Sequence, residues 1–308
     1  MNYKSLLDLL KAFPDEESCV RHLEQLRWPN GGVCPLCGSS RKIYRVERSS
    51  GYKCGDCKKQ FSVRKGTIFE ESRLPLVKWF AAAWLMASNR KGIPSTQLAR
   101  EIGVTQKTAW FMLSRLRDVA ATIGYDVDEP LDGIVEADET YMGGKEKNKH
   151  KSKRTEGTQG RSTKTKTPVA VIVERHGKSV AKKVEDTSGE TLKGNIRKHV
   201  SKTANMMTDQ WVGYQGLETE YASHNTIDHS LEEYVRGAVH TNTAESWIAL
   251  LKRGYVGVYH HFTEKHLSRY LAEYQARWNM IGYNEAERLD SILKSTPGHK
   301  LTYKELIA

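Results

Sequence analysis

Four cysteines carry the clearest chemical signal in this 308-residue sequence. Cys34, Cys37, Cys54 and Cys57 form two C-x-x-C pairs, CPLC and CGDC, with sixteen residues between them. This is the ligand spacing of a zinc ribbon, in which four thiolates hold one structural Zn²⁺. Two disulfides or a redox-active pair are the alternatives. We expect no secretory signal, which argues against disulfides, and two matched pairs argue against a single redox motif. We therefore predict zinc, and leave open whether the ribbon also contacts DNA.

Three acidic residues further along the chain could bind divalent cations. Asp138 and Asp209 each end a predicted strand, and Glu245 lies in the first turn of a predicted long helix. Mg²⁺ and Mn²⁺ prefer oxygen ligands, so carboxylates suit them better than histidines do. Two such ions about 3.5–4 Å apart would activate an attacking hydroxyl and stabilise the leaving oxygen in phosphoryl transfer. Glu139 and Glu136 are expected to point away from Asp138 and to have a structural or supporting role.

The elements that must position these acids are predicted from the pattern of apolar residues after residue 130. The predicted strands are 132–142, two strands within 167–187 that turn at His176 and Gly177, 204–209 and 221–228; the predicted helices are 188–200, 242–255 capped by Thr241, and 264–279. Three strands, helix, strand, helix or turn, strand and helix is the order of an RNase-H-like fold. We therefore predict an α/β fold class with an RNase-H-like catalytic domain at 126–285.

A helix-turn-helix is predicted within residues 71–125. The apolar segment 74–89 is long enough for a buried helix, Ser95 is expected to cap a short helix at 96–102, and Thr105 to cap a longer one at 106–122. In this motif the second helix enters the major groove of DNA. The residues expected to face DNA are Gln106, Lys107 and Thr108, and those expected to pack inward are Trp110, Leu113 and Leu116. An ordinary helical hairpin is the alternative.

Residues 143–167 differ in composition from the rest of the chain. They hold nine lysines and arginines, two glutamates, and no aliphatic residue, Phe, Tyr or Trp, so their net charge of +7 makes up most of the chain's +11. We expect a mobile loop that follows DNA phosphates and becomes ordered on DNA; a solvated insertion without a role is the alternative. The residues expected to contact phosphates are Lys145, Lys147, Lys149, Lys151, Lys153 and Arg154.

Three segments resemble the DDE transposases of bacterial insertion sequences, and most of all an ISXO-like group with an N-terminal zinc ribbon. The segments are DETYMGGK (138–145), MTDQWVGY (207–214) and HTNTAESWIALLKRGYVGVYHH (240–261). The resemblance implies cleavage and strand transfer at transposon ends by catalytic acids at Asp138, Asp209 and Glu245. It also implies that Lys252, which matches the lysine after the third acid, holds a DNA phosphate. The third ligand of this group can be Asn, here Asn242; we choose Glu245 because a carboxylate binds a cation more strongly than an amide does.

The resemblance also implies the partners, which are double-stranded DNA (transposon ends and target) and further copies of the chain assembled on it. We expect a cytoplasmic, nucleoid-associated protein without a membrane segment, because the longest apolar run, 80–87, is far shorter than the ~20 residues that span a bilayer. The remaining predicted parts are a helical segment at 1–28, the ribbon at 29–70 and a tail at 286–308. A catalytically inactive DNA-binding protein or repressor is the main alternative function. A nuclease of related fold is less favoured, since a simple hydrolase does not need two DNA-reading modules.

Overall fold

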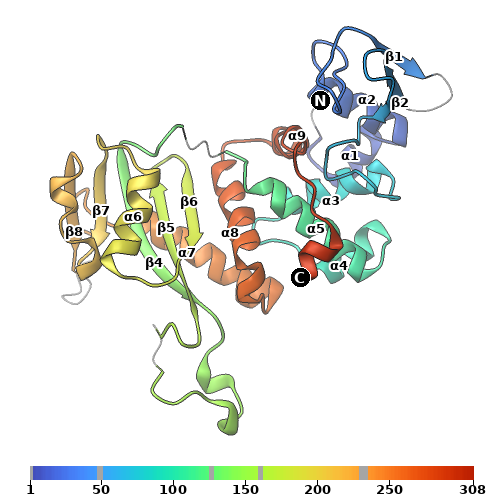
Figure 1. Cartoon of the computed structure of the whole chain (residues 1–308). Coiled ribbons are helices and arrows are strands. Elements are labelled where there is room, and N and C mark those ends of the chain that lie inside the picture. The colour runs from blue at the N-terminus through green and yellow to red at the C-terminus, as the bar shows by residue number, and fades with distance from the viewer. Residues whose placement is uncertain (1–2, 47–50, 125–127, 159–161, 229–234) are drawn as a thin grey trace. The chain divides into compact units, whose positions relative to one another are not determined.

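The structure is a computed structural model, and it describes residues 3–46, 51–124, 128–158, 162–228 and 235–308. The chain divides into two compact units (Figure 1). Unit 1 comprises residues 1–123 and 282–308, and unit 2 comprises residues 124–281. No helix in the described ranges is long and apolar enough to cross a membrane.

A small antiparallel sheet forms the ribbon of unit 1. Its strands are β1 (Ile43–Val46), β2 (Gly51–Cys54) and β3 (Gln60–Ser62), in that order. The turn predicted near Ser49 and Ser50 lies outside the described residues. The rings of Tyr52 and Phe61 stack across β2 and β3 with centroids 5.6 Å apart, and Trp28 packs edge-on against both. These three rings give the short strands an apolar core that so small a sheet otherwise lacks.

Helices make up the rest of unit 1. They are α1 (Leu6–Ala12), α2 (Glu16–Arg27), α3 (Leu76–Ser88), α4 (Ser95–Ile102), α5 (Gln106–Ala120), α9 (Glu285–Lys294) and α10 (Tyr303–Ile307). The central helix is α3, which is buried along most of its length and packs against α1, α2, α4, α5 and α9. The segment 286–308, for which we predict a tail, thus contributes helices to unit 1. The buried Arg115 of α5 links α5 to two distant segments of unit 1, because it donates hydrogen bonds to the carbonyl oxygens of Ile68 (2.5 Å) and Leu301 (2.9 Å).

The α4–turn–α5 hairpin has the predicted local structure. Gly103 ends α4 in the left-handed conformation (φ 62°), and the side chain of Thr105 accepts a hydrogen bond from the backbone N–H of Thr108, so the predicted cap at Thr105 is confirmed. The predicted cap at Ser95 is wrong. Because Pro94 holds the N-cap position, Ser95 is the first residue of α4, and its hydroxyl accepts a hydrogen bond from Gln106 Nε2 (2.9 Å).

Unit 2 is built on a five-stranded sheet. Its strands are β4 (Ile134–Met142), β5 (Thr167–Glu174), β6 (Ser179–Lys183), β7 (Asn205–Asp209) and β8 (Ser223–Ile227), in the order β6-β5-β4-β7-β8. The β4–β5 and β5–β6 pairs are antiparallel, whereas β4–β7 and β7–β8 are parallel. An antiparallel meander extended on its first strand by two parallel strands is the RNase-H-like arrangement, so the predicted fold is confirmed.

Helices cover both faces of this sheet (Figure 1). The helix α6 (Gly189–His199) packs on the face that includes Val135 and Ala137, whereas α7 (Asn242–Gly254) and α8 (Glu264–Asn279) pack on the face that includes Met142. Because side chains alternate along a strand, the odd-numbered residues of β4 face α6 and the even-numbered ones face α7. Asp138 is therefore on the α7 side.

Several short helical turns complete unit 2. Two 3₁₀ turns, η1 (Glu146–Asn148) and η2 (Lys151–Lys153), lie in the basic loop between β4 and β5, and η3 (Val212–Tyr214) and η4 (Leu217–Thr219) lie between β7 and β8. A π-helical turn, η6 (Tyr255–Tyr259), continues α7 without a break. Single π-helical turns within α-helices are frequent at functional sites.

Candidate active site

Two aspartates meet where β7 ends beside the middle of β4. Asp209 is the last residue of β7 as predicted, but the prediction that Asp138 ends its strand is wrong, because β4 continues to Met142. The β4–β7 register pairs Glu136 with Met207, and extending it by two residues places Asp138 beside Asp209. Asp138, Glu139 and Asp209 offer carboxylate oxygens that all lie within 4.8 Å of one another. This distance suits a shared divalent cation, which takes several oxygen ligands at once. The structure thus brings together two of the three acids predicted from the sequence.

Burial and mutual repulsion make this cluster electrostatically unusual. Burial, together with the negative charges of Glu139 and Asp209, raises the pKa of Asp138 to about 7. The buried Tyr214 hydroxyl donates to Glu139 Oε2 (2.9 Å), and burial together with the charges of Glu139 and Asp138 raises the pKa of Tyr214 well above its ordinary value. The backbone N–H of Trp211 donates to Asp209 Oδ1 (3.1 Å). The ionised forms of these carboxyl groups are unfavourable at this site, and a bound cation would stabilise them.

Glu139 points to the α6 side of β4, opposite to Asp138 as expected, and accepts its hydrogen bond from Tyr214 there. Its carboxylate still lies within 4.8 Å of those of Asp138 and Asp209, which the sequence does not predict. Glu245 is not placed as the sequence predicts. Glu245 is exposed in the first turn of α7, accepts a hydrogen bond from Thr241 Oγ1 (3.2 Å), and lies outside the group of three clustered acids. It is nevertheless near enough that its charge contributes to raising the pKa of Asp138. Asn242, the first residue of α7, is also exposed.

Glu136 fixes the start of α7 against the sheet. Its side chain is fully buried and accepts hydrogen bonds from the backbone N–H groups of Thr243 (2.7 Å) and Ala244 (3.0 Å) and from Thr243 Oγ1 (2.9 Å). These are donors of the first helical turn, where a negative charge is favourable. Arg175 Nε also donates to Glu136 (2.5 Å), and its other nitrogens donate to the carbonyl oxygens of Ala238 and His240.

This contact corrects the expectation that Glu136 faces away from Asp138. Residues two apart on a strand share a face, so Glu136 and Asp138 both face α7. Since Glu136 holds Thr243, it also sets the position of Glu245, which lies two residues further along α7.

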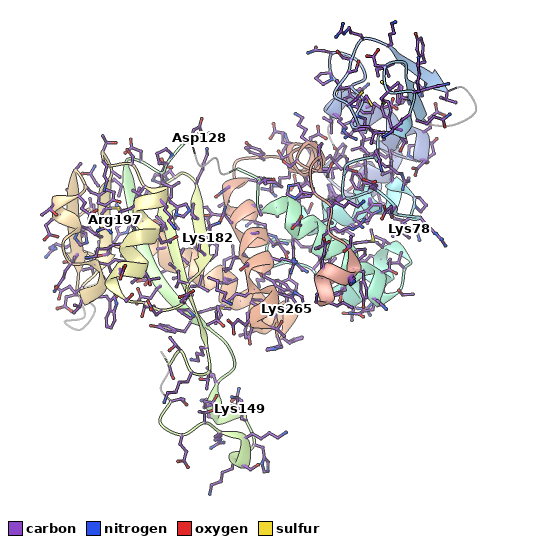
Figure 2. The ribbon with its side chains drawn as sticks, in the orientation of Figure 1. Lys78, Asp128, Lys149, Lys182, Arg197 and Lys265 are labelled. Carbon is purple, nitrogen blue, oxygen red and sulfur yellow. The ribbon has the colours of Figure 1, made fainter. Side chains whose placement is uncertain are left out.

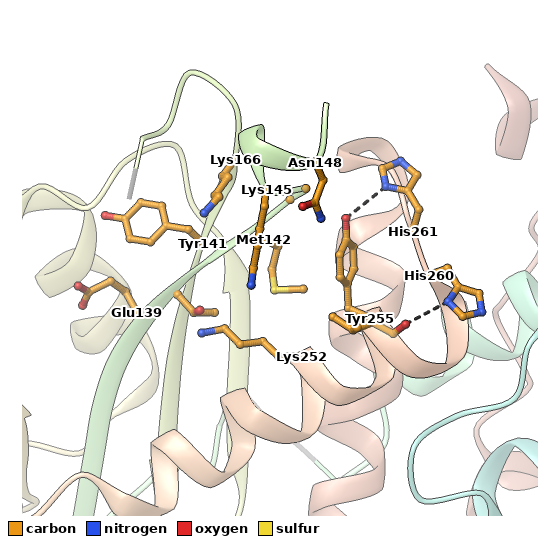
Figure 3. A pocket seen from close by; sticks show the side chains of 14 residues that line it. Glu139, Tyr141, Met142, Lys145, Asn148, Lys166, Lys252, Tyr255, His260 and His261 are labelled. Atoms are coloured by element: carbon orange, nitrogen blue, oxygen red, sulfur yellow. Dashed lines mark hydrogen bonds between the residues drawn. The ribbon is translucent and has the colours of Figure 1, made fainter. Parts of the chain in front are cut away.

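A cavity of about 790 Å³ lies beside the clustered acids. It is bounded by the end of β4 and the following loop, by Lys166, and by the end of α7 with η6 (Figure 3). The side chains of Lys252, Lys145 and Lys166 point into it from different segments. Burial lowers the pKa of Lys252, and the opposing influence of the Asp138 charge shows that Lys252 lies near the acids. Sequence reasoning did not select Lys166 or Tyr255, because only the fold brings these distant segments together.

The four predicted zinc ligands also meet. The Sγ atoms of Cys34 and Cys57 are 3.8 Å apart, those of Cys37 and Cys54 are 3.7 Å apart, and all four lie within 4.8 Å of one another. A tetrahedron with Zn–S bonds of ~2.3 Å has edges of about 3.8 Å, so the set fits zinc. The two knuckles have the same backbone shape, since the residue after the second cysteine has a positive φ in each, 74° at Gly38 and 61° at Lys58.

The predicted DNA-contacting residues are mostly at the surface. In unit 1, Gln106 and Lys107 are exposed at the start of α5, Thr108 is half-buried, and Lys107 Nζ lies 4.7 Å from the ring centroid of Tyr303. Leu113 and Leu116 are buried as predicted, while Trp110 is only half-buried. In unit 2 the basic loop extends from the sheet and carries Lys149, labelled in Figure 2. The loop residues predicted to contact phosphates are all exposed; they are Lys145, Lys147, Lys149, Lys151, Lys153 and Arg154.

An RNase-H-like sheet with acids in the middle of β4 and at the end of β7, in a chain that also holds a four-thiolate ribbon and a helical hairpin, is the organisation of a transposase. Comparison with known proteins agrees. Residues 130–279 match the model of the ISXO2-like transposase domain, and residues 14–60 match that of the transposase zinc-ribbon domain. The chain belongs to the family of ISXO2-like transposases with an N-terminal zinc ribbon.

Two individual proteins show how far the similarity extends. An uncharacterized protein in transposable element ISH50 of Halobacterium salinarum is 30% identical over 299 residues, which cover 93% of this chain and 98% of that protein. The crystal structure of the Mos1 strand transfer complex matches 72% of this chain and 79% of that chain at 13% identity, with a TM-score of 0.28, a likeness too low to carry an argument. The predicted family and transposase function are confirmed by the family models and the first relative.

Proposed function

We propose that this transposase cleaves and joins DNA at the ends of its insertion sequence by cation-assisted phosphoryl transfer at Asp138 and Asp209. One observation carries the proposal: three carboxylates lie within 4.8 Å of one another on the adjacent parallel strands β4 and β7, and the pKa of Asp138 is raised to about 7. Such a cluster is unfavourable by itself and is relieved by a divalent cation.

Each side chain at the site has a role in this proposal. Asp138 and Asp209 hold the cation, Mg²⁺ or Mn²⁺, with Glu245 as the third ligand on α7 and Glu139 adding charge from β4. Two bound ions would supply activation of the attacking hydroxyl and stabilisation of the leaving oxygen. Lys252 donates hydrogen bonds to a phosphate oxygen of the DNA and holds the scissile group beside the carboxylates.

DNA recognition is assigned to the helical hairpin and the basic loop. Gln106, Lys107 and Thr108 contact the transposon end from the start of α5, and the loop cations from Lys145 to Arg154 follow phosphates without reading sequence. The ribbon holds its zinc as a structural ion. The protein acts on double-stranded DNA as a homo-oligomer, in the cytoplasm and associated with the nucleoid.

A strand-transfer assay tests the proposal. Linear DNA bearing the element's terminal repeats is incubated with protein and Mg²⁺ or Mn²⁺, and cleaved and joined products are separated on a gel. Asp138→Ala and Asp209→Ala should abolish both products while binding the same DNA in gel-shift measurements. Full activity in both variants would refute the mechanism, and DNA binding without any product from the unaltered protein would favour the inactive DNA-binding alternative.

The same assay decides the third ligand. Glu245→Ala should remove activity, and Asn242→Ala should retain most of it. The reverse result would assign the position to Asn242. Loss of activity in Glu139→Gln, with Glu245→Ala still active, would instead make Glu139 the third ligand.

A further inference from the structure

The cavity beside the acids has the size of a small-molecule site. Its volume of about 790 Å³ falls in the ~300–1,000 Å³ range of pockets that bury most of a compact ligand. A DNA duplex, with two paired strands, does not fit within such a volume, whereas one or two nucleotides of a single strand do. All of its lining residues belong to unit 2.

The walls of the cavity differ in chemistry. Lys145, Lys166 and Lys252 present three ammonium groups from the loop, from the segment before β5 and from α7. The remaining wall includes the thioether of Met142 and the ring of Tyr255. Three converging ammonium groups favour binding of an anionic group, whereas a thioether and an aromatic ring favour binding of a flat apolar group.

The ring of Tyr255 is held in place from two sides. Its hydroxyl and His261 Nδ1 are 3.2 Å apart and hydrogen-bonded (Figure 3), and its ring packs edge-on against Phe262 with centroids 4.8 Å apart. The backbone around it is unusual: Tyr255 begins the π-helical turn η6, and His260 has φ 58° and ψ −34°, outside the common regions for a residue with a side chain. Strain of this kind is concentrated at ligand-binding positions.

We propose that this cavity binds one unpaired nucleotide of the DNA strand being processed. A nucleotide combines a phosphate for Lys145, Lys166 and Lys252 with a base that lies against Tyr255 and Met142. Glu139 lines the cavity and is also one of the clustered acids, so the occupant is a nucleotide next to the scissile phosphate. The inference rests on the proposed function, since it takes the acids to mark the position of the reacting phosphate.

Binding measured without divalent cations tests this inference separately from catalysis. Duplexes with the sequence of the element's end are compared by fluorescence anisotropy, either blunt or with one unpaired nucleotide at the 3′ or 5′ end. Stacking of one base on an aromatic side chain predicts about five- to 150-fold tighter binding of one overhang than of the blunt duplex. An abasic overhang should bind like the blunt duplex, and this comparison needs no protein variant. Equal affinity for all duplexes would overturn the inference, whether or not the protein cleaves DNA.

Protein variants then locate the base. Tyr255→Ala should abolish the overhang preference and Tyr255→Phe should keep it, because only the ring is required. Tyr283→Ala is the matched control, since Tyr283 is exposed and lies outside the cavity. Loss of the preference in Tyr255→Phe as well, or its survival in Tyr255→Ala, would overturn the placement of the base on this ring. Asp138→Ala should keep the preference although it is inactive, so each proposal can fail without the other.

Discussion

Replacing Glu136 by Ala tests whether the link between β4 and α7 positions the active site. The substitution leaves Arg175 without its buried carboxylate and leaves the N–H groups of Thr243 and Ala244 without an acceptor. Removing one partner of a buried ion pair costs about 3–5 kcal/mol. Arg175 keeps its two other hydrogen bonds, to the carbonyl oxygens of Ala238 and His240. We therefore expect the free energy of unfolding to fall by about 3 kcal/mol, near the lower end of this range. Glu136→Gln keeps the size and one acceptor and should cost less, about 1–3 kcal/mol.

Two measurements on the full-length protein separate position from stability. Amide hydrogen exchange in the first turn of α7 should speed up in Glu136→Ala, since its N–H groups lose their acceptor. Strand transfer should fall at temperatures where circular dichroism shows the protein still folded, because Glu245 and Lys252 are on the displaced helix. Glu185→Ala, an exposed acid just after β6, is the control and should change the free energy of unfolding by less than about 0.5 kcal/mol. Unchanged exchange and full activity in Glu136→Ala would refute the reasoning.

Three further predictions follow from the other features. Cys54→Ser should release the zinc, measured by atomic absorption, and should disorder the ribbon, seen in near-ultraviolet circular dichroism; a variant that keeps stoichiometric zinc would contradict the four-thiolate site. Because the pKa of Asp138 is about 7 in the folded state and about 4 when unfolded, the cation-free protein should lose thermal stability as pH rises from about 4 to 7, and Asp138→Asn should flatten this profile; equal slopes would contradict it. Deleting 146–164 should lower DNA affinity and flatten its dependence on salt, by about 0.9 in log–log slope for each phosphate that the loop neutralises, and an unchanged slope would show that the loop has no such role.

Local spacing was enough to predict some of these features. The two C-x-x-C pairs define the four-thiolate cluster because each knuckle is a tight turn. Asp138 and Asp209 meet because the strand order makes β4 and β7 parallel neighbours in a register that places the two residues side by side. Neither inference needs a side-chain contact.

The remaining features depend on tertiary contacts that no local pattern records. Glu136 binds Thr243, which is 107 residues away, and its role as the acceptor for a helix start is visible only once α7 is placed. The nearness of Glu139 to Asp138 depends on how far its side chain reaches, which alternation along a strand does not describe. The cavity combines segments around residues 140, 166 and 255, so its lysines and its tyrosine carry no shared sequence signal.

The packing of α9 has a consequence for the order in which the protein can be made. Unit 2 is one continuous stretch, 124–281, inserted between the two parts of unit 1. As the chain leaves the ribosome, unit 2 can fold before α9 exists, while the apolar surface of α3 that α9 covers stays open until residues 285–294 have been synthesised. A premature stop codon just after residue 281 would therefore leave a complete catalytic sheet attached to an unfinished ribbon-and-hairpin unit. Late truncations of the gene should impair the recognition of DNA ends before they impair the fold that carries the acids.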